Sequence, residues 1–268
     1  MTSTDLSNKI LTEISKTGFP LELRVSNYLH KNDYLVANNI YYVDLDEGKG
    51  RELDIRALKN YEIKKEKNTF YCRNWYFIEC KKSKKKPWVF FTSPQTPYDV
   101  DLFRLGCKGS MYSPTEGWHV PEIMSKLHKI HPFINATNFG RSYMEAFKDF
   151  ESGKAILNSL VSSAKSVAMA KFKESENTSI GINHYYPIVV FEGDLYEAYL
   201  DNDEIFLRES NIIYVSFFYQ SPKYEDGKYI IPVVKEKYLP QLIASLDDVL
   251  GFIGDKAKEN LNLLKKGI

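Results

Sequence analysis

Apolar positions recur at helical spacing in four parts of the chain, and each is predicted to be a helix. Pro20 lies where a proline is tolerated, in the first turn of the second helix. Small and apolar residues alternate along the third predicted helix, which begins at Gly140, and this pattern suits packing on a sheet. The predicted helices cover a short segment around residues 10–14 that ends near Gly18, Pro20 to about Asn32, Gly140 to about Phe172, and Leu239 to about Leu264.

Strand-like runs separate these helices. They lie at about 34–43, 52–58 and 70–81 in the first half of the chain, and at 187–191, 196–200, 205–207, 212–219 and 230–234 in the second. The run 187–191 is continuously apolar, the pattern of a strand that is buried on both faces. Lysines and Pro87 are expected to end the third strand, because proline cannot continue a ladder.

This order predicts one mixed α/β domain over residues 1–268. Its core covers about 18–83 and 140–264, with extra strands and a helix at the C-terminal end. Between them, residues of about 84–139 are rich in proline, glycine and aromatic side chains and are predicted to form an irregular insertion.

Bulk composition excludes several classes of protein. Of the 268 residues, 43% are apolar, which indicates a globular chain. The odd number of cysteines, three, without CxxC spacing argues against a disulfide framework or a structural zinc site. No signal peptide and no apolar run of roughly 20 residues is present, so we expect no membrane association and a cytoplasmic location.

The net charge of +1 is unevenly distributed. Residues 51–90 carry a net charge of +7, and residues 192–248 carry −7. The basic part includes a cluster that could hold phosphates, namely Lys82, Lys84, Lys85 and Lys86. An ordinary solvated strand end is the alternative interpretation of these lysines.

Two predicted strands carry charge where buried strands are usually apolar. Asp54 lies in the second strand, and Glu79 and Lys81 lie in the third. Strand residues alternate faces, so Leu53 and Ile55 are expected on one face and Asp54 on the other. If the strands are adjacent and antiparallel, Asp54 lies beside Glu79, with Lys81 one step along.

This set of side chains suits metal-assisted hydrolysis. Two carboxylates repel each other unless a positive charge neutralises them, and oxygen ligands are those that Mg²⁺ prefers. A lysine orients or deprotonates a water and offsets charge on a phosphate. Glu22 shares the inward side of its helix with Val25 and Leu29, an unusual place for a carboxylate.

Each of these residues also has a structural explanation. Asp54 fits the polar face of an edge strand, Glu79 and Lys81 fit a strand end entering solvent, and Glu22 fits a partly exposed helix face. Their combination, in the order helix, strand, strand, favours the catalytic interpretation.

Glu22, Asp54 and Glu79-Cys80-Lys81 resemble the motif of the PD-(D/E)XK nuclease superfamily, and most closely its Holliday-junction-resolvase-like and Mrr-like members. The resemblance implies a restriction-endonuclease-like αβββαβ core, Mg²⁺ that Mn²⁺ can replace, and a DNA substrate. By position, Asp54, Glu79 and the Cys80 carbonyl would be metal ligands, Lys81 the catalytic lysine and Glu22 an accessory acid. The chain departs from the motif in having Leu53 in place of its proline.

The sequence therefore predicts a metal-dependent deoxyribonuclease. The form that fits the resemblance is an endonuclease that acts in restriction, defence or repair. Duplex cleavage by such folds usually needs two active sites, so a homodimer is expected, and a specificity subunit is left open. The alternatives are a catalytically inactive DNA-binding protein of the same fold and a scaffold in which these charges form structural ion pairs.

Overall fold

A computed structural model describes residues 3–65, 68–97, 99, 107–109, 125–127, 129–148, 152–174, 181–224 and 227–263. The helices are α1 (Ser3–Lys16), α2 (Phe19–Lys31), α5 (Lys154–Glu174) and α6 (Leu239–Leu263), with a short 3-10 helix η2 (Glu236–Tyr238) before α6. The strands are β1 (Leu35–Asp44), β2 (Lys49–Lys65), β3 (Asn68–Pro94), β4 (Cys107–Gly109), β5 (Asn138–Glu145), β6 (Gly181–Asp201), β7 (Glu204–Glu209), β8 (Ile212–Tyr219) and β9 (Gly227–Lys235).

These strands form one mixed sheet, which confirms the predicted α/β class. Its order is β1-β2-β3-β5-β8-β9-β6-β4, with β7 paired to β6. The pairs β1–β2 and β2–β3 are antiparallel, whereas β3 and β6 run parallel through the centre. Because β6 pairs with both β3 and β9, the path β3-β5-β8-β9-β6 closes on itself.

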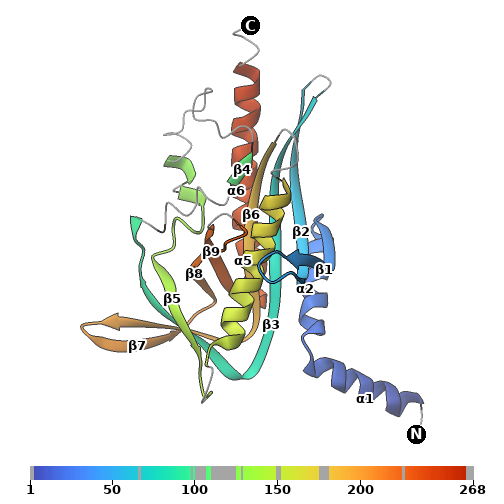
Figure 1. Ribbon diagram of the computed structural model, residues 1–268, viewed down its shortest axis with the longest axis vertical. Coiled ribbons are helices and arrows are strands. Elements are labelled where there is room, and N and C mark those ends of the chain that lie inside the picture. The colour runs from blue at the N-terminus through green and yellow to red at the C-terminus, as the bar shows by residue number, and fades with distance from the viewer. Residues whose placement is uncertain are drawn as a thin grey trace.

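Helices cover both faces of the central strands (Figure 1). On one face, α2 and α6 pack on a cluster that includes Ile55, Ile78 and Ile188. On the other face, α5 packs on a cluster that includes Phe77 and Val189. The alternation of buried side chains in β3 and β6 between these clusters explains why the run 187–191 is continuously apolar, as predicted for a strand buried on both faces.

The third strand does not end at its lysines, contrary to the prediction. β3 continues to Pro94, and its parallel register with β6 shifts between Ser83↔Gly193 and Trp88↔Leu195. The residues 84–87 therefore loop out as a bulge, where Pro87 needs no ladder hydrogen bond. Gly193 permits the close approach at this point, because a Cβ there would lie 2.4 Å from the Ser83 carbonyl oxygen.

The predicted long helix from Gly140 also begins later than expected. Asn138–Glu145 is strand β5, which pairs antiparallel with the end of β3, and α5 starts only at Lys154. Gly153, with a positive φ of 89°, directly precedes the helix. Residues 88–94 thus pair within the sheet, and most of the remaining predicted insertion lies outside the described residues.

The N-terminal helix projects from the body of the molecule (Figure 1). Its boundary with α2 falls at Gly18, as the sequence predicts. Along the described parts of the chain, the helices are too short or too polar to cross a bilayer.

Candidate active site

The candidate site forms where β2 separates from β3. The two strands pair from Lys65↔Asn68 to Ile55↔Ile78, but β2 continues beside β1 to Lys49. Asp54 is the first residue of β2 beyond the last pair with β3. A gap between neighbouring strands therefore opens at the predicted catalytic aspartate.

Regular alternation of side chains breaks at the same residue. Leu53 lies in the cluster beneath α5, whereas Ile55 lies in the cluster beneath α2 and α6. In β1, Asn39 has a positive φ of 49°. Asn38 pairs with Ile55 and Ile40 pairs with Leu53, so the ladder between β1 and β2 leaves out Asn39 and Asp54. The prediction that Leu53 and Ile55 share a face was therefore wrong, because both strands are irregular at this level.

The Asp54 side chain occupies the gap. The backbone N–H of Cys80 donates to Asp54 Oδ2 at 2.7 Å. This hydrogen bond takes the place of the one that a backbone carbonyl of β2 would accept if β2 stayed paired with β3. The N–H and C=O of one strand residue point to the same side of the strand. The carbonyl of Cys80 therefore faces the gap too, while its thiol lies in the core beneath α2 and α6.

Lys81 joins the two predicted carboxylates. Its ammonium donates to Glu79 Oε2 at 3.0 Å and lies 3.8 Å from Asp54 Oδ2. Burial would lower the Lys81 pKa, but the neighbouring Glu79 and Asp54 outweigh that effect and raise it. Lys81 is therefore a cation at neutral pH. The structure brings together all three side chains that the sequence placed at one site.

Glu79 is the most enclosed member of the site. Its side chain is 4% exposed, and Ser162 of α5 donates to Oε1 at 2.6 Å. Burial first, and then the charge of Asp54, raise the Glu79 pKa despite the opposing effect of Lys81. Glu79 is thus a buried carboxylate with a second carboxylate, Asp54, close by and Lys81 and Ser162 as its hydrogen-bond donors.

Glu22 lies near this group from the side of α2. It is half-buried, and its pKa is raised by burial and then by the charge of Asp54, while Lys81 opposes the shift. Leu21 and Val25 fill the core beneath α2, so the helix directs Glu22 to the edge of that core. The predicted accessory acid is therefore within electrostatic reach of the other site residues.

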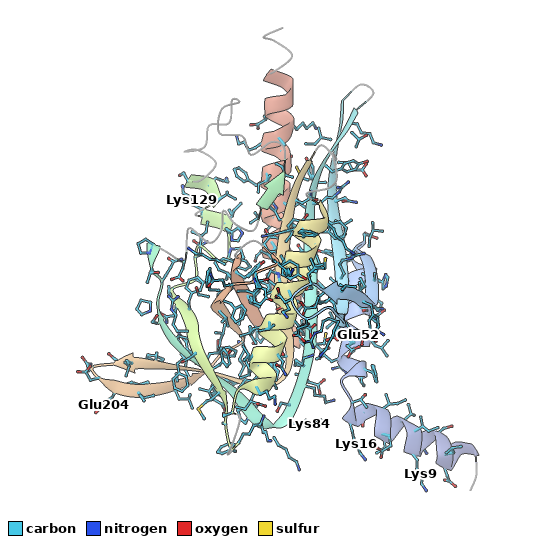
Figure 2. All side chains as sticks on the ribbon, in the orientation of Figure 1. Lys9, Lys16, Glu52, Lys84, Lys129 and Glu204 are labelled. Carbon is cyan, nitrogen blue, oxygen red and sulfur yellow. The ribbon has the colours of Figure 1, made fainter. Side chains whose placement is uncertain are left out.

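The four predicted phosphate-binding lysines fall into two groups. Lys84, Lys85 and Lys86 are exposed on the bulge of β3, and Figure 2 shows Lys84 at the bend of that strand. Lys82 is instead engaged within the protein, because its ammonium contacts Glu192 and the Ser15 carbonyl oxygen, each at 3.0 Å. Arg24 of α2 pairs with the same Glu192 at 2.7 Å.

Sequence reasoning missed Ser162 and Glu192. Ser162 is one of four serines within residues 159–166 of α5, and no spacing in the sequence distinguishes it from Ser159, Ser163 or Ser166. Glu192 directly follows the apolar run 187–191, so the sequence placed it at a strand end, where a charge is ordinary, whereas β6 continues to Asp201. Their roles follow only from the packing of α5 and β6 against β3.

The arrangement offers two carboxylates and an ammonium, the groups that could face a divalent cation and a phosphate. No three His, Cys, Asp or Glu side chains surround a common point in the described parts of the chain. Mg²⁺ does not need such a cage, since it typically takes one or two carboxylates together with waters and phosphate oxygens. Asp54 Oδ1 receives no hydrogen bond from any described residue, which leaves a hard oxygen ligand beside Glu79 and the Cys80 carbonyl.

Comparison with known proteins adds no assignment: no protein-family model, curated protein or solved structure matches this chain.

Proposed function

We propose that the protein is a metal-dependent nuclease that hydrolyses phosphodiester bonds in DNA. One observation carries the proposal: Asp54 and Glu79 converge on the ammonium of Lys81 where β2 and β3 separate. Structural ion pairs do not require such a gap. Two acids and a lysine beside an unpaired strand edge are what metal-assisted hydrolysis of a phosphate needs.

Asp54, Glu79 and the carbonyl of Cys80 would hold Mg²⁺, with Mn²⁺ as a substitute. The donor set supports this fit, because Asp54 and Glu79 lie 3.8 Å and 3.0 Å from the Lys81 ammonium and a further positive charge would relieve the repulsion between the two carboxylates. When bound, the metal supplies a water of lowered pKa and polarises the scissile phosphate.

Lys81 orients the attacking water and offsets the negative charge that develops on the phosphate. Its raised pKa keeps it protonated, so it donates hydrogen bonds and is not a base in the free protein. Glu22 has a raised pKa as well, and its position beside Asp54 suits an acid that accepts or returns a proton through water. Burial raises the Cys80 pKa, which keeps its thiol out of the chemistry.

The order of elements supports the implied restriction-endonuclease-like core. α2, β1, β2 and β3 precede α5 and β6 in the chain, and β3 pairs parallel with β6. Strand β5, inserted before α5, and the C-terminal strands are additions to that order. Restriction, defence and repair are all compatible with this core.

Binding of DNA is proposed through the exposed lysines of the β3 bulge. We expect a variant with Lys84, Lys85 and Lys86 all replaced by Gln to bind DNA more weakly at low salt. The salt dependence of its affinity should be shallower by roughly two to three units of log–log slope, because each phosphate contact releases about one counterion. Fluorescence anisotropy at several salt concentrations measures this slope. An unchanged slope would place the phosphate contacts elsewhere.

Ser162 is expected to hold the carboxylate of Glu79 in position. Replacing Ser162 by Ala removes the 2.6 Å hydrogen bond to Oε1 and should weaken metal affinity by roughly 10- to 100-fold. Saturating metal should restore most of the cleavage rate. Ser166, which bonds within α5, provides a matched Ser→Ala control. Equal metal affinities in the two variants would remove the positioning role of Ser162.

The function is tested by incubating the protein with Mg²⁺ and a set of labelled substrates that includes duplex DNA, single-stranded DNA, branched DNA and RNA. We expect cleavage of DNA that EDTA prevents and that Mn²⁺ restores. Cleavage of RNA alone would revise the substrate. Salt-sensitive DNA binding without any cleavage would favour the inactive DNA-binding alternative. Neither binding nor cleavage would favour the scaffold.

A further inference from the structure

Helix α1 has an apolar face that the rest of the described structure leaves exposed. Leu6, Ile10 and Ile14 follow each other at four-residue intervals and therefore share one side of the helix, with Leu11 beside them. Their exposed fractions are 52%, 50%, 42% and, for Leu11, 62%. A helix of 14 residues with its apolar side in water is marginally stable, and it gains stability when that side is covered.

The C-terminal end of this helix is fixed to the body of the protein. The Lys82 ammonium donates to the carbonyl oxygen of Ser15, and Lys82 is held in turn by Glu192. From that anchor α1 extends outward, with Lys16 near the body and Lys9 farther away (Figure 2). The apolar face is therefore held out from the surface next to the strand that carries Lys81.

The charges of α1 argue against nucleic acid or a membrane as the partner for this face. Asp5 and Glu13 balance Lys9 and Lys16, so the helix has no excess positive charge. Binding to DNA, or to an anionic bilayer by an amphipathic helix, depends on such an excess.

A second copy of the same helix fits both the apolar pattern and the charges. In an antiparallel pair centred on Ile10, Leu6 of each copy lies opposite Ile14 of the other, and the two Ile10 side chains meet. Lys9 and Glu13 are four residues apart and share one flank of the helix. Lys9 of each copy then lies within about 3 Å, along the axis, of Glu13 of the other. Two symmetric ion pairs flank the apolar contact.

We propose that α1 is the docking surface for α1 of a second copy, packed antiparallel about a two-fold axis at Ile10. Four apolar side chains per copy are fewer than a standard interface contains, so the contact is of the small, weak class. If the proposed function holds, the dimer presents two active sites to one DNA duplex, because α1 is anchored beside the Lys81 strand in each copy.

Sedimentation velocity over roughly 1–200 µM protein, without metal or DNA, tests the interface independently of catalysis. We expect a dimer with a Kd on the order of micromolar for an interface of this size. Ile10→Glu places two like charges on the axis and should weaken the dimer at least about 100-fold. Thr12→Glu adds the same charge to the polar side of the same helix and should leave the dimer intact. A monomer across the whole range, or equal Kd values for the two variants, would overturn the proposal.

Charge reversal tests the antiparallel pairing itself. Lys9→Glu and Glu13→Lys each bring like charges together across the dimer, and each should weaken self-association by roughly tenfold. Mixing the two variants creates opposite charges at both cross-pairs, so the mixture should form heterodimers as tightly as the wild type forms homodimers. Loss of stability within one helix cannot be rescued by mixing. Failure of the mixture to associate would therefore contradict the antiparallel arrangement.

The two proposals fail separately. A stable dimer that does not cleave DNA would leave the interface standing and remove the nuclease. Metal-dependent nicking by a strict monomer would support the nuclease and remove the α1 interface. If both hold, Ile10→Glu should nick plasmid but linearise it more slowly than Thr12→Glu at the same protein concentration.

Discussion

Replacing Glu79 by Gln is expected to abolish metal binding and DNA cleavage together while the chain stays folded. The substitution keeps the size of a side chain that is 4% exposed and removes the charge that a metal ion needs. The cleavage rate should fall at least about a thousandfold, equivalent to roughly 4 kcal/mol of activation free energy. Glu62→Gln makes the same chemical change at an exposed position of β2 and should cleave like the wild type.

The same variant has a distinctive pH dependence of stability. The Glu79 pKa is raised by burial, so the folded state binds more protons than the unfolded state between the ordinary pKa of 4.5 and the raised value. The contribution of Glu79 to the free energy of unfolding of the wild type therefore increases as pH falls through the raised pKa, because Glu79 takes up a proton more readily in the folded state. Glu79→Gln lacks that gain, so its stability relative to the wild type should be greatest at neutral pH and decline toward pH 4.5.

Urea denaturation across pH, with and without Mn²⁺, measures both effects. Metal should stabilise the wild type and leave Glu79→Gln unchanged, because a ligand stabilises only a state that binds it. Metal stabilisation of equal size in both proteins would mean that the ion binds away from Glu79.

Replacing Lys165 by Met is expected to have the largest effect on stability outside the site. Lys165, on α5, contacts the fully buried carboxylate of Asp44 at the end of β1, and its own side chain is 8% exposed. Removing one partner of a buried pair costs about 3–5 kcal/mol, because the remaining charge stays buried without compensation. Arg51, 3.6 Å from Asp44, should keep the loss near the lower end of that range.

The double variant Asp44→Asn, Lys165→Met should be less destabilised than Lys165→Met alone, since it leaves no isolated charge. Burial opposes ionisation of Asp44, but the Lys165 contact prevails and lowers the Asp44 pKa. The stabilisation from Asp44 is thus present above its ordinary pKa of 3.8 and is lost as pH falls through the lowered value. Denaturation at neutral pH, with Lys173→Met as the exposed control on α5, checks both variants. A loss below about 1 kcal/mol in Lys165→Met would contradict a buried pair.

Local pattern was enough to predict most helices, most strands and the charged centre of the candidate site, but not Ser162 or Glu192. The stripe of Leu21, Val25 and Leu29 identified α2, and charge within the otherwise apolar strands identified Asp54 and Glu79. These features are encoded over a few neighbouring residues, so one sequence suffices to find them.

Features that depend on distant pairing could not be predicted. Pro87 ends a strand by local rules, yet here it falls in a bulge that the parallel pairing of β3 with β6 accommodates. Asn138–Glu145 has a helix-compatible composition, but pairing with the end of β3 makes it a strand. The break in alternation at Asp54 likewise arises because β2 stays with β1 and leaves β3.

Asp54, Glu79 and Lys81 are proposed to be where phosphodiester chemistry takes place. The most direct measurement is nicking of supercoiled plasmid in Mg²⁺ or Mn²⁺ by the wild type, by Lys81→Ala and by Lys64→Ala, with EDTA controls. Lys64 is exposed in the part of β2 far from Asp54 and serves as the matched lysine. We predict metal-dependent nicking by the wild type and Lys64→Ala, and none above background by Lys81→Ala. Nicking by Lys81→Ala at the wild-type rate would contradict the assignment of this site.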